Sequence, residues 1–151
     1  MSNIQVHAIY GSMIVAPKGI DRLLAIRSEG AGQPMIFVIA PVCDGILELD
    51  GVLEAAKCHD ERLWGMLESR MNAWTSLVES RIPSPYRMDV LQEIKKGFAQ
   101  VEDLLKAIWL VGDVSSGASR FVDAIVGRWA ALLMRESFAS NSHPCEIRNI
   151  R

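Results

Sequence analysis

The feature that most constrains this chain is its longest apolar run, Met35 to Val42. Gly32-Gln33-Pro34 precedes the run and Asp44-Gly45 follows it, so turn-forming residues stand on both sides. A short, continuous apolar run of this kind is typical of a strand that is buried on both faces, as strands of parallel sheets are. We therefore expect a strand at 35–41. The run is far shorter than the roughly 20 apolar residues that a membrane helix needs, so we expect no membrane partner.

The residues before this run predict a β-α-β opening. Residues 4–10 are rich in Ile, Val and Tyr and indicate a first strand. Pro17-Lys18-Gly19 predicts a turn, and the spacing of Ile20, Leu23 and Leu24 predicts a helix over 19–29. A strand, a helix and a second strand in this order favour a parallel pair with a right-handed crossover.

The middle of the chain has helical periodicity, and its end has strand periodicity. We expect a helix that begins at Asp44-Gly45, then three helices over roughly 60–80, 86–111 and 120–136, with Asp60 and Ser119 as caps of the first and last. Residues 145–151 alternate in polarity and predict a third strand. The predicted fold is one α/β domain over 1–151: a small parallel sheet of about three strands, with a helical subdomain (about 46–136) inserted between strands 2 and 3.

Composition and charge exclude several classes of protein. The chain has 16 basic and 18 acidic residues, a formal net charge of −2, so it has no basic surplus to hold a nucleic-acid backbone. Its three cysteines are widely spaced and odd in number, which is typical of reduced thiols. The N-terminus lacks the segments of a signal peptide, so we expect a cytoplasmic protein. No Cys or His pair has the spacing of a zinc site, and we expect neither a metal nor a cofactor.

Four stretches of the chain, taken in order, resemble motifs of a known family. They are Ile9-Tyr10-Gly11-Ser12-Met13-Ile14-Val15; Val38-Ile39-Ala40-Pro41-Val42 with Asp44-Gly45-Ile46-Leu47; Gly112-Asp113 with Ile125-Val126-Gly127-Arg128; and Cys145-Glu146-Ile147-Arg148-Asn149-Ile150-Arg151. In that order they resemble the N-terminal part of the aspartokinases, in the amino-acid kinase superfamily. The family motifs read Lys-Phe-Gly-Gly-Thr-Ser-Val, Val-Val-Ser-Ala-Met with Gly-Val-Thr-Asp, Gly-Glu or Gly-Asp with Ser-Phe-Gly-Glu, and Ala-Glu-x-x-Asp-Ala-Arg. The later half of the family's kinase domain, which largely forms the ATP site, has no counterpart here.

The departures from the family motifs predict that aspartokinase activity is absent. The resemblance implies a phosphate-neutralising lysine where this chain has Ile9, and phosphate- and substrate-binding Thr and Ser where it has Met13 and Ile14. Ile46 stands where the family has a threonine associated with aspartate binding. Arg128 stands where the family has a glutamate that contacts the substrate amine. Phosphoryl transfer depends on positioning and electrostatic stabilisation, and losing one such donor costs about 10²–10³ in rate. We therefore expect a non-catalytic, pseudo-kinase domain.

A remnant of the family's pocket is the candidate ligand site. Its residues are Tyr10, Gly11, Ser12, Asp44, Gly45 and Arg128. Each also has an ordinary structural interpretation. Gly11-Ser12 fits a plain strand-to-helix turn, Asp44 fits a helix cap, and Arg128 fits a solvated helix arginine. The four tryptophans, Trp64, Trp74, Trp109 and Trp129, all fall on predicted helices, where burial in the core or in an interface is expected.

A narrow parallel sheet with few elements to cover it predicts an interaction surface. The leading hypothesis is a binding or scaffold protein linked to amino-acid or secondary-metabolite biosynthesis. It would be covered by a second copy as a dimer, or by a protein of the same pathway, with a possible small-molecule ligand. One alternative is a repurposed enzyme that takes a more apolar biosynthetic substrate, its old site relined by Ile9, Met13, Ile14 and Ile46. Another is a split-kinase subunit, and the loss of the lysine at Ile9 counts against it.

Overall fold

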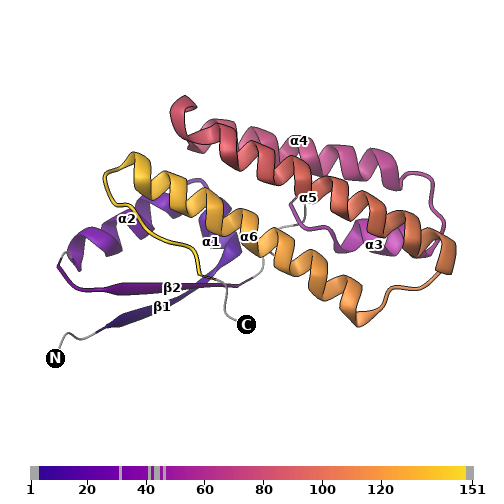
Figure 1. Ribbon diagram of the computed structural model, residues 1–151, viewed down its shortest axis with the longest axis horizontal. Helices are drawn as coiled ribbons and strands as arrows, with labels where there is room; N and C mark the ends of the chain where they lie inside the picture. Colours follow the sequence, from indigo (N-terminus) through magenta and orange to yellow (C-terminus); the bar gives the residue numbers. More distant parts are fainter. Residues whose placement is uncertain (1–3, 31, 41, 43–44, 46, 149–151) are drawn as a thin grey trace.

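The computed structural model describes residues 4–30, 32–40, 42, 45 and 47–148 as a mixed α/β structure that is mostly helical (Figure 1). The elements in chain order are β1 (Gln5–Tyr10), α1 (Gly11–Val15), α2 (Gly19–Glu29), β2 (Met35–Ala40), α3 (Asp50–Lys57), α4 (Leu63–Arg81), α5 (Ser84–Val111) and α6 (Ser116–Ser140). The coarse prediction of an α/β chain with a small parallel sheet is confirmed. Among these helices, none combines the length and apolar character needed to cross a bilayer.

The sheet of the described residues has two parallel strands. β1 pairs with β2 in a register that runs from Gln5 opposite Met35 to Tyr10 opposite Ala40. The strand at 35–41 and the helix at 19–29 are therefore found where their sequence patterns placed them. The third strand is not confirmed. Residues 145–148 form no ladder, Ile147 packs partly buried against the core, and 149–151 lie outside the described residues.

The junction of β1 and α1 differs from the expected Gly-Ser turn, because α1 begins at Gly11 directly after the strand. Gly11 lies against the end of β2. A Cβ added there would be 2.8 Å from the carbonyl oxygen of Ala40 and 2.6 Å from Cγ2 of Val42. Only glycine allows so close an approach of two backbones. The glycine is thus explained by packing at this junction.

Two helix starts were predicted incorrectly because the residues chosen as caps have other roles. Gly45 lies in a turn and α3 begins at Asp50, while Asp44 and Ile46 lie outside the described residues. Asp60 does not cap α4, which begins at Leu63. Its carboxylate instead accepts hydrogen bonds from the backbone and side chain of Arg62.

Two further helices, α5 and α6, begin a few residues earlier than the sequence indicated. α5 begins at Ser84, because a proline in the first turn of a helix removes only an N–H that has no partner there. α6 begins at Ser116, and its cap is Ser115 rather than Ser119. The hydroxyl oxygen of Ser115 accepts a hydrogen bond from the Ala118 N–H at 3.1 Å.

Helices α3–α6 pack into a bundle around an aromatic centre. The Trp129 indole of α6 stacks on Phe98 of α5 with 4.6 Å between ring centroids, and meets Trp74 of α4 edge-on at 5.3 Å. All three rings are buried. The Trp74 indole N–H donates to the carbonyl of Leu47 at 3.0 Å, which ties the segment before α3 to the bundle.

Helix α6 also packs against one face of the sheet. In Figure 1 it runs from the bundle to the two strands. Phe138, near its C-terminus, meets Phe37 of β2 edge-on at 5.7 Å between centroids. Because α6 belongs to both the bundle and the cover of the sheet, the prediction of a separate inserted helical subdomain is not confirmed.

Candidate functional site

The predicted remnant pocket is described only in part. Tyr10 ends β1 and is exposed, Gly11 is buried at the start of α1, and Ser12 is partly buried beside it. Asp44 lies outside the described residues. Gly45 is exposed in a turn, where a Cβ would meet no atom within 4 Å. Tyr10, Gly11 and Ser12 are together because they are consecutive in the chain.

The positions that correspond to the family's phosphate-binding residues are mostly core positions. Ile9 and Ile14 are both buried, and Ile14 has no exposed surface. Met13, between them, is partly exposed. Apolar side chains therefore fill the β1–α1 junction on its inner side.

Arg128 lies on α6 and faces α5. Its Nε is 3.5 Å from a carboxylate oxygen of Glu93, and both side chains are close to half exposed. The two residues border a groove of about 260 Å³ between α5 and α6, which Lys96 and Ile125 also line. The carboxylate that Arg128 contacts thus comes from its own chain, in an exposed ion pair of the kind that contributes little to stability.

The face of the sheet turned away from α6 is open. It consists of the alternate residues Val6, Ala8, Tyr10, Ile36, Val38 and Ala40, and is called the open face below. The exposed fractions are 64% for Val6, 71% for Tyr10, 49% for Ile36 and 38% for Val38. The inner residues Ile9 and Phe37 belong to the core. An open sheet was expected from the sequence, and the structure shows which residues form its surface.

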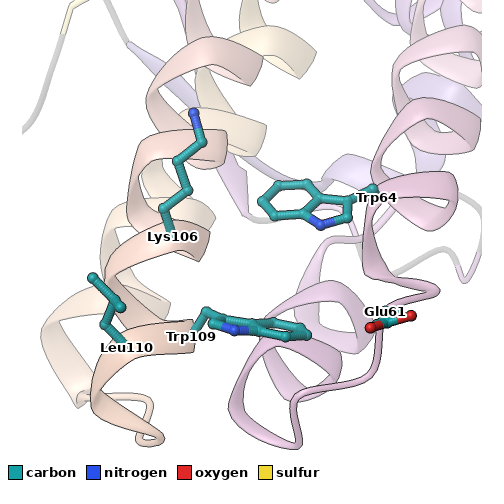
Figure 2. Close-up of a pocket in the computed structure, with 5 residues that line it drawn as sticks. All are labelled: Glu61, Trp64, Lys106, Trp109 and Leu110. Carbon is teal, nitrogen blue, oxygen red and sulfur yellow. The ribbon is translucent and has the colours of Figure 1, made fainter.

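A second exposed feature is a cleft of about 600 Å³ between α4 and α5. Its lining residues are Glu61, Trp64, Lys106, Trp109 and Leu110 (Figure 2). Trp64 is 42% exposed and Leu110 is 85% exposed. The sequence interpretation missed this cleft because it favoured burial for every tryptophan. One signal was present: Leu110 lies outside the apolar stripe of its helix, and Trp109 lies at the edge of that stripe.

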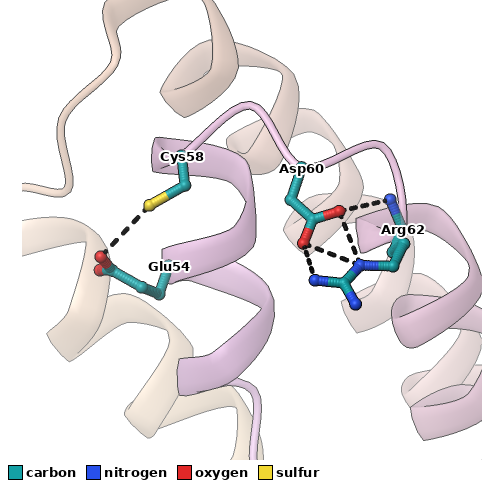
Figure 3. A network of polar contacts seen from close by, with 4 residues as sticks. All are labelled: Glu54, Cys58, Asp60 and Arg62. Atoms are coloured by element: carbon teal, nitrogen blue, oxygen red, sulfur yellow. Dashed lines mark hydrogen bonds and ion pairs between the residues drawn. The ribbon is translucent and has the colours of Figure 1, made fainter.

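The corner between α3 and α4 holds a small polar network (Figure 3). The Cys58 thiol donates to a Glu54 carboxylate oxygen at 3.5 Å, and this hydrogen bond raises the pKa of the thiol. Arg62 donates to the Asp60 carboxylate, with Nη2 at 2.6 Å, and holds the pKa of that carboxyl below its ordinary value. A raised pKa makes Cys58 a poor nucleophile. The network therefore closes a helix corner rather than activating a catalytic group.

The described residues contain no cluster of three or more His, Cys, Asp and Glu side chains that could hold a metal ion. Comparisons with known proteins give no relative for this chain: no family model matches it, and neither a curated protein nor a solved structure shows significant similarity.

Proposed function

We propose that this chain is a non-catalytic, aspartokinase-like binding protein that associates with a second copy of itself through the open face. The observation that carries the proposal is the exposure of an apolar face on a parallel sheet. Parallel strands are normally covered on both faces. The open face is therefore the surface that lacks the cover a parallel sheet normally has.

A second copy suits this face because the face carries no charge. All six of its residues are uncharged, and only Tyr10 has a polar group in its side chain. In a two-fold dimer the same surface meets itself, so any charged residue near the axis would face its own copy. The open face has no such repulsion. Ile4, which is exposed just before β1, extends the face by strand alternation.

The size of the open face sets the expected strength of the dimer. Strands of six residues are about 20 Å long and two of them are about 10 Å wide, so the face covers about 200 Å² per copy. Stable interfaces bury about 800 Å² per partner. We therefore expect a weak dimer that is populated only at high protein concentration.

The burial of Ile9 and Ile14 supports a non-catalytic role over a repurposed enzyme. An enzyme site needs convergent polar groups around an enclosed cleft. At the β1–α1 junction these two side chains belong to the core, and two clefts lined by described residues lie elsewhere, between α4 and α5 and between α5 and α6. Under this proposal the chain resembles the aspartokinases without having the family's chemistry.

The test of self-association is sedimentation velocity over a hundredfold range of concentration. The wild-type protein is expected to shift from monomer toward dimer. Val6→Lys places a charge in the open face and is expected to keep the protein monomeric. Met88→Lys, a comparably exposed apolar residue on α5, is the matched control and is expected to dimerise as the wild type does. A wild type that stays monomeric at every concentration would refute the dimer.

The absence of catalysis is tested separately with a coupled assay of ADP release. The mixture holds the purified protein, ATP, Mg²⁺ and aspartate. We expect no release above the rate without protein, because Ile9 stands at the position of the family's phosphate-neutralising lysine, and Met13 and Ile14 stand at the positions of its phosphate- and substrate-binding Thr and Ser. Aspartate-dependent turnover that persists through further purification would refute the non-catalytic assignment and leave the dimer unaffected.

A further inference from the structure

We infer that the cleft between α4 and α5 is a binding site for an organic ammonium cation, either quaternary or methylated. The site is separate from the open face and does not depend on the proposed function. The inference comes from three properties of the residues that line the cleft: two indole rings, a lysine whose charge is already compensated, and a carboxylate beside them.

The two indoles come from different helices. Figure 2 shows Trp64 of α4 and Trp109 of α5 extending into the same space, one above the other in this view. Trp109 has a ring partner, because His59 packs against it edge-on with 5.0 Å between centroids. His59 takes a left-handed backbone conformation, with φ of 55°, at the end of α3. This conformation is uncommon for a residue other than glycine, and it places the imidazole ring where it supports the Trp109 indole.

Lys106 contributes its aliphatic stem to the cleft rather than a free charge. Its ammonium nitrogen is 2.8 Å from a Glu102 carboxylate oxygen and 3.7 Å from one of Asp103. Figure 2 shows this nitrogen pointing away from the space between the indoles. Two carboxylates therefore compensate the one positive charge at this edge, and an incoming anion would compete with both.

Glu61 supplies the charge that selects the ligand. It lies in the segment between α3 and α4, beside the far end of the Trp109 indole (Figure 2). It takes part in none of the ion pairs of the described residues, whereas the neighbouring Asp60 is paired with Arg62. With Glu102 and Asp103 around Lys106, the charged groups near the cleft sum to a net negative charge. A cation is attracted there and an anion is repelled.

These groups together match one chemical class of ligand. The face of an indole carries the negative end of a quadrupole and attracts a cation within about 6 Å of the ring centre. Methyl groups on the ammonium reduce its hydration, which favours transfer from water to an aromatic surface. The cleft volume of about 600 Å³ lies within the range of small-molecule sites. It exceeds the size of a trimethylammonium group, and the rest of such a ligand would lie along Leu110.

The first experiment compares choline with 3,3-dimethylbutan-1-ol, its uncharged isostere, by NMR of the indole N–H groups. Choline is expected to bind with a dissociation constant on the order of millimolar, about fivefold or more tighter than the isostere. The N–H signals of Trp64 and Trp109 should shift, while those of the buried Trp74 and Trp129 stay. Equal binding of the isostere, tighter binding of benzoate, or shifts confined to Trp74 and Trp129 would overturn the inference.

Variants then test the individual residues in the same titration. Glu61→Gln is expected to weaken choline binding about two- to fivefold without changing binding of the isostere. Glu79→Gln removes an exposed carboxylate near the other end of α4, away from the cleft, and is the matched control, expected to bind as the wild type does. Trp64→Ala should lower choline affinity about fivefold or more. Unchanged affinity in both cleft variants would overturn the inference, and circular dichroism verifies that each variant is folded.

Discussion

The helical bundle and the two-stranded sheet close their cores in different ways. The bundle of α3–α6 surrounds Trp74, Phe98 and Trp129, and all three are buried by its own helices. The sheet with α1 and α2 is covered by α6 on one face only. A helix satisfies its backbone hydrogen bonds internally, whereas a sheet has edges and two faces that need neighbours. The sheet, rather than the bundle, therefore keeps an apolar face without cover, and this is the face through which we propose that a second copy binds.

One helix connects the two regions. Trp129 lies in the centre of the bundle, and Phe138, further along α6, packs on β2. The two residues are nine positions apart, about 13 Å along a helix. The sheet is thus held to the bundle by the C-terminal part of α6, so each region can be disturbed by a separate substitution in the same helix.

The largest effect is expected for Trp129→Ala. The ring is buried against Phe98 and Trp74 and fills the space above Gly97, so its removal leaves a large cavity. Truncation of a buried Trp typically lowers the free energy of unfolding by about 3–5 kcal/mol. Urea unfolding followed by circular dichroism measures the loss. A loss below about 1.5 kcal/mol would show that the bundle does not depend on this centre.

Phe138→Ala is the matched variant for the sheet. Its expected effect is local: faster amide hydrogen exchange in β1 and β2, with protection of α4 and α5 retained. Equal loss of protection in both regions would show that they unfold as one unit, and the comparison would then fail.

The next largest effect concerns the glycine at the start of α2. A Cβ on Gly19 would lie 1.5 Å from the carbonyl oxygen of Met13, a backbone atom that cannot rotate away. Gly19→Ala should lower the free energy of unfolding by about 1–3 kcal/mol. Gly127→Ala is the control within α6, where a Cβ meets no atom within 4 Å. It should raise stability by about 1 kcal/mol through helix propensity. Thermal melts of both variants measure whether their stabilities change in opposite directions relative to the wild type. A change in the same direction in both variants would contradict the close packing of α1 against α2.

The smallest effect is expected at the α3–α4 corner of the bundle. Arg62 lowers the pKa of Asp60 in the folded protein, so the ionised carboxylate is favoured by folding. Its contribution is present above the unfolded pKa and is lost as the pH falls through the lower, folded pKa. The stability difference between wild type and Asp60→Asn should therefore shrink between neutral pH and about pH 2.5. Urea unfolding midpoints of both proteins at the two pH values measure this stability difference. A difference that does not change with pH would contradict the interaction of Arg62 with ionised Asp60 as its cause.

Periodicity allowed much of the fold to be predicted. The strand at 35–41, the helix at 19–29 and the three long helices were indicated by apolar spacing, and the structure has them within a few residues. Errors came from single polar residues. Asp60 and Ser119 were assigned as caps, but Asp60 binds Arg62 and the cap of α6 is Ser115. Several residues near each helix start suit a cap equally well in sequence, and the backbone path chooses among them.

The candidate sites were harder to predict than the fold. The open face could be anticipated because a narrow sheet lacks cover, although its residues were not identified in advance. The cleft between α4 and α5 was missed because Trp64 and Trp109 look in sequence like Trp74 and Trp129, which are buried. Arg128 was expected beside the opening motif, and its ion pair is with Glu93 of α5. Contacts between distant segments are not encoded in local spacing.

The sequence by itself determined which segments are helices and strands, and which side of each is apolar, because these depend on periods of 3.6 and 2 residues along one chain. Only the tertiary structure decided which apolar surfaces meet. It covered Ile9 and Phe37 with helices, left Val6 and Ile36 open, and brought two indoles to one cleft. The physical reason is that burial depends on the arrangement of neighbouring elements, which no single segment specifies.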